Sequence, residues 1–199
     1  LQVLRDPAAP SNQPVSTFSQ WLVSWRKSPK PKQVTWLCGP EQVLKDDVAD
    51  SIRRMLDLDA WSYLPLVVGE DSERTVWAAL DEHPLGNSQR LVVVQHADRL
   101  TQWHRLEEWV KRRTENPRTH VVFISDEEKI ARTDPTADER RKGVKEELLP
   151  HLAAISGKGP IIECRPFTQA TAKHAITWVR MRLTMREPVS AHLLDPAKG

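Results

Sequence analysis

The sequence predicts an α/β fold built on a parallel sheet of five strands with helices on both faces. Short segments such as residues 91–94 and 121–124 are apolar at every position, which is typical of strands buried on both faces of a parallel sheet. Amphipathic helical segments alternate with these strands along the chain, as they do in sheets covered on both sides. A chain of 199 residues, 39% hydrophobic and 28% charged, can supply the core of such a domain.

Runs and spacings of apolar residues place the elements. Strands are expected at residues 34–38, 63–68, 90–95, 120–125 and 161–164. Helices are expected at residues 17–27, 41–56, 72–83, 101–113 and 138–155, and again from Thr168 onwards. Because every strand is followed by a helical segment, sequential strands are expected to run parallel.

Three regions follow from this order. They are an N-terminal arm with a short amphipathic helix (1–33), an α/β domain without a phosphate loop (34–165), and the start of a helical lid that is cut short (166–199). The arm is expected to be extended, because residues 1–14 contain three prolines. The helix after the arm begins at a Ser16 or Thr17 cap and carries Phe18, Trp21, Leu22 and Trp25 at i, i+3, i+4 and i+7, so its apolar stripe needs a partner surface. Since the chain starts at Leu1, we expect it to be part of a longer protein.

Charge and cysteine usage limit the functional classes. The 29 basic and 27 acidic residues leave a net charge of +2, so any contact with DNA must be local. Basic residues gather on the predicted lid with no carboxylate before Glu187, and these are candidates for DNA proximity: Lys173, Arg180, Arg182 and Arg186. Two cysteines without a CxxC pair indicate neither a disulfide framework nor a Cys-rich zinc site, and favour a reducing cytosol. No apolar run is long enough to span a membrane.

The turn after the first predicted strand of the domain decides whether a nucleotide is expected. A phosphate loop there is rich in glycine and ends in Lys and Ser or Thr. This turn instead has Gly39 alone, then Pro40, which lacks an amide donor, and Glu41, whose charge would repel phosphate. We therefore predict no bound cofactor and no ATP hydrolysis, although Lys45 leaves a degenerate nucleotide site as an alternative.

Metal and catalytic chemistry have little support in the sequence. The seven histidines do not show the spacing that would place two metal ligands on one helical face. His96 and His104 lie near Asp98, but no Ser or Cys nucleophile stands in a recognisable turn. Cys38 and Cys164, at the ends of predicted strands, are interpreted as small buried residues. We predict no metal, no catalytic residues and no enzyme activity.

Three segments together resemble the delta subunit of the bacterial clamp loader, DNA polymerase III delta. That family's opening strand, non-phosphate turn and first helix are similar to the segment TWLCGPEQVLKDDVADSIRRML. The family's Pro-Leu element and its valine strand closed by Ala-Asp resemble the segment ALDEHPLGNSQRLVVVQHADRL. Its later strand, junction and lid helix resemble the segment IIECRPFTQATAKHAITWVRMRL, which includes the pair Trp178-Val179. The resemblance runs from about residue 34 to 194. It implies an AAA+-like domain that does not bind ATP, then a lid, then a collar domain that this sequence lacks.

The resemblance also implies partners and a site. Delta proteins push hydrophobic residues near the Pro-Leu element into a pocket of the sliding clamp and open the ring. Here Pro84 and Leu85 match that element, while Gly86 stands where the family has an aromatic residue. The expected partners are therefore the sliding clamp and other clamp-loader subunits, with DNA nearby through the assembly, no membrane and no small-molecule substrate, in the cytoplasm.

Two alternatives stay open at this point. One is a replisome adaptor without chemistry that keeps the fold and binds another protein through its Trp-rich N-terminal helix and lid. The other is a divergent AAA+ ATPase that uses Lys45.

Overall fold

The computed structural model describes residues 15–59, 61–84, 88–113, 118–126, 152, 155 and 159–185. The chain divides into two compact units, Leu1–Arg165 and Pro166–Gly199. Each unit is described by itself. The predicted arm (1–14), and all but residues 152 and 155 of the predicted helix at 138–155, lie outside the described residues.

The first unit is built on a parallel sheet of six strands in the order β1-β6-β2-β5-β4-β3. The strands are β1 (Val15–Thr17), β2 (Val34–Cys38), β3 (Tyr63–Val67), β4 (Arg90–Gln95), β5 (Thr119–Ile124) and β6 (Ile161–Glu163). The predicted α/β class and parallel sheet are confirmed. The predicted number of five strands is wrong, because β1 adds an edge strand in which Val15 pairs with Ile161. Three residues are too few to show the pattern of a strand.

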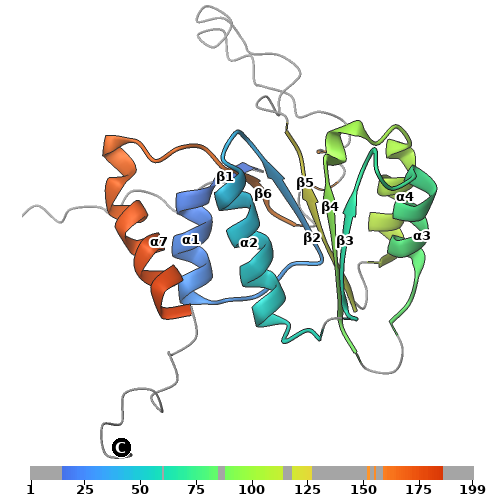
Figure 1. The fold of residues 1–199 in the computed structure, drawn as a ribbon, viewed down its shortest axis with the longest axis horizontal. Helices are drawn as coiled ribbons and strands as arrows, with labels where there is room; N and C mark the ends of the chain where they lie inside the picture. Colours follow the sequence, from blue (N-terminus) through green and yellow to red (C-terminus); the bar gives the residue numbers. More distant parts are fainter. Residues whose placement is uncertain are drawn as a thin grey trace, which may run out of the picture. The chain divides into compact units, whose positions relative to one another are not determined.

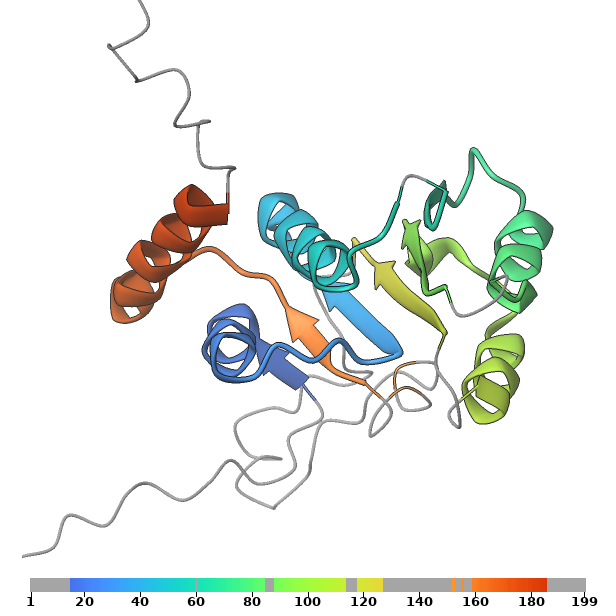
Figure 2. The ribbon, with the colours of Figure 1, turned by 90° about the horizontal axis from the view of Figure 1, so that it is seen from below.

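Helices cover both faces of the sheet, as predicted. They are α1 (Phe18–Lys27), α2 (Gln42–Met55), α3 (Glu73–Asp81) and α4 (Trp103–Arg113), with a short 3-10 helix, η1, at Ala97–Arg99. Figures 1 and 2 show α1 and α2 side by side on one face of the sheet and α3 and α4 on the other. No helix of the described ranges is long and apolar enough to cross a membrane.

The pleat of the strands divides the core between these two faces. Successive side chains of a strand point to opposite faces. In β2, Trp36 joins the cluster that contains Trp77 of α3 and Trp109 of α4. Thr35 and Leu37 therefore face α1 and α2, and both are buried. Strands apolar on both faces are what a doubly covered parallel sheet requires.

The apolar stripe of α1 is buried within the same chain. Thr17 caps the helix in a capping box with Gln20, whose amide donates to the Thr17 hydroxyl over 3.3 Å. Phe18, Leu22 and the tryptophans of the stripe are buried. The partner surface that the stripe needs is thus the chain's own sheet edge, where α1 contacts β1 and β6.

The second unit contains a short 3-10 helix, η2 (Gln169–Thr171), followed by α7 (Ala172–Met185). The predicted start at Thr168 is confirmed, since Thr168 caps η2 with Thr171. Within this unit, the Phe167 and Trp178 rings lie 5.7 Å apart and the Arg182 guanidinium lies 5.6 Å from the Trp178 ring centroid.

Candidate functional site

Parallel α/β sheets bind ligands at the carboxyl ends of their strands, and the position where a phosphate loop would stand is the turn between β2 and α2. Gly39 has a φ of +99°, and a Cβ at this position would lie 2.5 Å from the Cys164 carbonyl oxygen. The Glu41 amide donates to that same carbonyl over 3.1 Å, and Pro40 has no amide hydrogen. The turn is packed against the end of β6, so the Glu41 amide is directed to a carbonyl of the chain.

Lys45 of α2 points into the protein. Its side chain is 2% exposed, and Nζ donates to the Ser125 carbonyl oxygen over 3.1 Å. The ammonium also lies 3.8 Å from the Asp126 carboxylate, which is half exposed. Lys45 thereby joins α2 to the end of β5, and its charge is neutralised within the fold.

The end of β4 contributes a histidine to the same cluster of charges. His96 has a φ of +53°, and its Nδ1 lies 2.6 Å from Asp126 Oδ2. The Asp126 amide donates to Asp98 Oδ1 over 3.0 Å. The sequence suggested a pair between Asp98 and His96 or His104. In the structure His96 pairs with Asp126, and His104 is exposed. In the described residues, no group of three or more His, Cys, Asp and Glu side chains could hold a metal.

The two cysteines lie buried beside this turn. The Cys164 amide donates to the Cys38 carbonyl over 2.7 Å, and the Cys38 thiol lies 3.6 Å from the Ile162 carbonyl oxygen. Both cysteines are fully buried, and neither forms a disulfide. Burial raises the pKa of the Cys164 thiol far above its ordinary value, which keeps it protonated and unreactive. The interpretation of both cysteines as small buried residues is confirmed.

Of the predicted clamp-binding element, only Pro84 is described, and it lies near the opposite, amino-terminal edge of the sheet. Pro84 is half-buried in the connection between α3 and β4, and Leu85 and Gly86 lie outside the described residues. An ion pair of 2.7 Å between Glu82 and Arg90 holds the end of α3 close to the start of β4. Glu82 and the residues that follow it up to Pro84 therefore lie near the first residue of β4.

Trp61 is an exposed aromatic residue at this same edge, and our reading of the sequence did not single it out. Its side chain is 93% exposed, two residues before β3. The following residue, Ser62, accepts a hydrogen bond of 2.8 Å from the Leu91 amide, so the approach to β3 lies next to the start of β4. The signal was present in the sequence: Trp61 stands in a polar connection outside any apolar periodicity.

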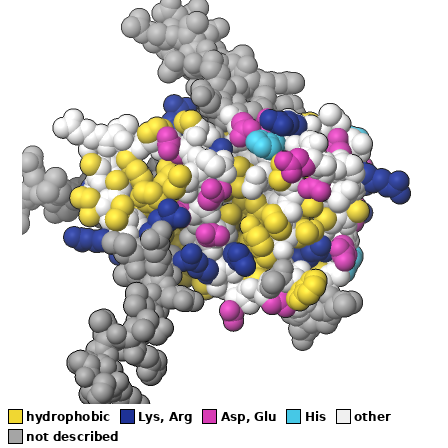
Figure 3. Space-filling view, in the orientation of Figure 1, with side chains coloured by type: hydrophobic (Ala, Val, Ile, Leu, Met, Phe, Trp, Pro, Cys, Tyr) yellow, Lys and Arg dark blue, Asp and Glu magenta, His cyan; other side chains and the backbone are white. Residues whose placement is uncertain are grey.

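The structure divides the predicted basic cluster of the lid. Lys173 and Arg180 are exposed and lie seven residues apart, which places them on one face of α7. Arg182 is half-buried against Trp178 on the other side of the helix, and Arg186 lies outside the described residues. Hydrophobic side chains are also exposed on α7 (Figure 3), where Ile176 is 56% and Val179 46% exposed.

Comparison with known proteins bears on the fold. No family model and no curated protein matches the sequence. Among solved structures, the DNA clamp loader delta protein of Bacillus subtilis matches with a TM-score of 0.60 over 82% of this chain and 48% of that protein, at 17% sequence identity. This chain has the fold of a clamp-loader delta protein. The resemblance predicted from the sequence is therefore confirmed at the level of the fold.

A second structural match is more distant. It is a DNA polymerase III gamma subunit-related protein of Thermotoga maritima, with a TM-score of 0.41 and 13% identity over 86% of this chain and 55% of that protein. The chain thus spans about half the length of both proteins.

Proposed function

We propose that this chain is a delta-like clamp-loader subunit that binds the sliding clamp and helps to open it without hydrolysing ATP itself. The observation that carries the proposal is the fold shared with the clamp loader delta protein, combined with a turn after β2 that is closed because its polar groups bond within the chain. In that turn the Glu41 amide bonds to the Cys164 carbonyl, and the Lys45 ammonium bonds to Ser125. A lysine that serves ATP must instead reach the phosphates. This role would place the chain in the cytoplasm, with the other clamp-loader subunits as partners and DNA near Lys173 and Arg180.

The clamp-binding surface is proposed at the amino-terminal edge of the sheet, around Pro84, Leu85 and Trp61. Gly86 replaces the aromatic residue that the resemblance implies, and a leucine alone contributes about 1.5 to 3 kcal/mol on burial. Trp61 is almost fully exposed on the same edge and supplies the missing aromatic area. Exposed tryptophans are enriched among the residues that dominate binding energy at protein interfaces.

Alanine variants test this surface. Trp61→Ala and Leu85→Ala are expected to weaken binding to the cognate sliding clamp by about 30-fold or more each, since interface hot spots cost about 2 kcal/mol or more. Val43→Ala is the matched control, because Val43 is also an exposed apolar residue but lies at the start of α2, near the other edge. Equal binding by all three variants in biolayer interferometry would refute the proposed surface.

The adaptor alternative loses its main feature in this structure. It relied on the tryptophans of α1 as a binding surface, yet Trp21 and Trp25 are each only 8% exposed. Binding of another protein through the exposed apolar residues of α7 is the part of this alternative that the structure still supports.

A further inference from the structure

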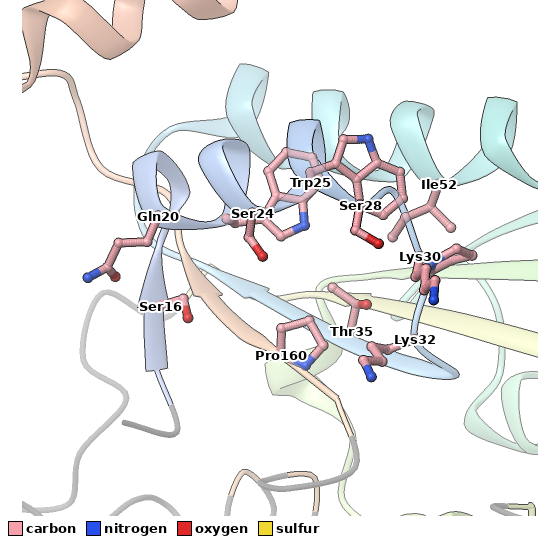
Figure 4. Close-up of a pocket in the computed structure, with 12 residues that line it drawn as sticks. Ser16, Gln20, Ser24, Trp25, Ser28, Lys30, Lys32, Thr35, Ile52 and Pro160 are labelled. Atoms are coloured by element: carbon pink, nitrogen blue, oxygen red, sulfur yellow. The ribbon is translucent and has the colours of Figure 1, made fainter. Parts of the chain in front are cut away.

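A pocket lies between α1 and the sheet, beside the residues that lead into β2 and β6, and Trp61 is not among the residues that line it. Its volume is about 230 Å³. Figure 4 shows residues of α1 above it, Thr35 of β2 and Pro160 below it, and Ile52 of α2 at one side. Neither the clamp-binding proposal nor the delta resemblance uses this pocket.

The residues around the pocket are basic and hydroxylated, with no carboxylate among them. Lys30 and Lys32 follow α1 and line the pocket, and neither pairs with an acidic side chain of the described residues. Ser24 and Ser28 add hydroxyl groups from the last turns of α1 and its cap. Two cations without a facing anion favour a negatively charged ligand.

Aromatic rings form one wall of the pocket. The Trp21 and Trp25 rings stack with centroids 5.3 Å apart, and both residues line the pocket. A flat apolar group placed against an indole gains both buried area and favourable ring contacts. The pocket thus offers one apolar side and one positively charged end.

Thr35 supplies the observation that points to a ligand. The residue is 1% exposed and lines the pocket, and its Oγ1 has no hydrogen-bonding partner among the described residues. A buried hydroxyl without a partner is costly, so such a group in a native fold calls for a bonded occupant. Valine has nearly the same shape as threonine, so packing against α1 does not by itself require a hydroxyl at this strand position.

We propose that this pocket binds a small organic anion that consists of an apolar ring carrying a carboxylate or a phosphate ester group. The ring lies against Trp25, the anionic group is held by Lys30 and Lys32, and a polar atom of the ligand bonds to Thr35 Oγ1. The inference does not rest on the clamp-loader role. A small-molecule ligand is also a partner that the sequence did not predict.

Phenyl phosphate is a suitable probe, with benzyl alcohol and inorganic phosphate as controls. In ¹H–¹⁵N NMR titrations of the whole chain at pH 7, phenyl phosphate is expected to shift the Trp25 indole and the Ser24, Ser28 and Lys30 amides, with a dissociation constant in the low millimolar range or tighter. Either control producing the same shifts at the same concentration would overturn the proposal, since ring and anion must act together.

Variants locate the binding. The double variant Lys30→Ala/Lys32→Ala is expected to weaken phenyl phosphate binding about tenfold or more, while Lys27→Ala, which alters an exposed lysine outside the pocket, leaves it unchanged. Thr35→Val is expected to weaken binding several-fold while the melting temperature stays the same or rises, because valine removes the unpartnered hydroxyl. If Thr35→Val lowers the melting temperature and leaves binding unchanged, Oγ1 has a structural role and the proposal is wrong.

Discussion

Replacing Lys45 by methionine tests whether this lysine stabilises the fold or serves a nucleotide. Methionine keeps most of the apolar stem of the lysine but removes the ammonium group. The Lys45 side chain is 2% exposed, and its ammonium donates to the carbonyl of Ser125, a residue that is itself fully buried. A hydrogen bond from a charged group contributes about 1.5 to 3 kcal/mol. The attraction to half-exposed Asp126 at 3.8 Å adds at most about 1 kcal/mol.

Relief of the cost of burying the ammonium offsets part of this loss, so Lys45→Met is expected to lower the free energy of unfolding by about 1.5 to 3 kcal/mol. Urea unfolding, followed by circular dichroism, measures this change in the free energy of unfolding, and the slope m of the free energy against urea concentration should stay unchanged. Lys27→Met, which alters an exposed lysine of α1, is the control and should change stability by less than about 0.5 kcal/mol. An unchanged stability for Lys45→Met, together with loss of ATP-analogue binding that the native chain possesses, would refute the structural role.

Three further predictions concern stability. Gly39→Ala should lower the melting temperature by several degrees, at a cost of about 2 kcal/mol or more, because φ is +99° and the new Cβ meets the Cys164 carbonyl; an unchanged melting temperature would contradict the closed turn. Burial alone would raise the pKa of Glu73, but hydrogen bonds from Gln102, Thr101 and Trp77 outweigh it and lower the pKa below 4.5. The Glu73 carboxylate therefore makes its full contribution to the free energy of unfolding above pH 4.5, and this contribution is lost as the pH falls through the pKa of the folded state. Glu73→Gln should therefore flatten the acid limb of the stability–pH curve. Burial lowers the pKa of His120 below 6.5 despite its bond to a backbone carbonyl, so stability should fall as the pH drops below 6.5, and urea midpoints of His120→Gln should not show this fall.

Much of the fold could be predicted because its elements are long or strongly apolar. The valine-rich segment that became β4 and the segment that became β5 contain no polar residue at their centres, and this pattern is typical of a strand buried on both faces. The stripe of α1 was equally clear, since four large apolar residues at helical spacing must be buried. Strand β1 was missed because its pairing with β6 depends on a residue far along the chain.

The candidate sites were harder to predict, because they depend on which segments the fold brings together. Glu41 and Pro40 indicated a turn unsuited to phosphate, but the bond from the Glu41 amide to Cys164 required the placement of β6 beside β2. The burial of Lys45 likewise depends on the end of β5. Trp61 stands in a polar connection outside any apolar periodicity, but only the structure shows that its side chain is 93% exposed.

Calorimetric titration of the cognate sliding clamp into this chain, with and without Mg-ATP, tests the central claim most directly. The account predicts saturable binding with a dissociation constant of about 10 μM or tighter, the same in both conditions, since about 7 kcal/mol is within reach of a surface with a leucine and a tryptophan anchor. No heat of binding at tens of micromolar would contradict the proposed function. Binding that requires ATP would contradict the closed turn after β2.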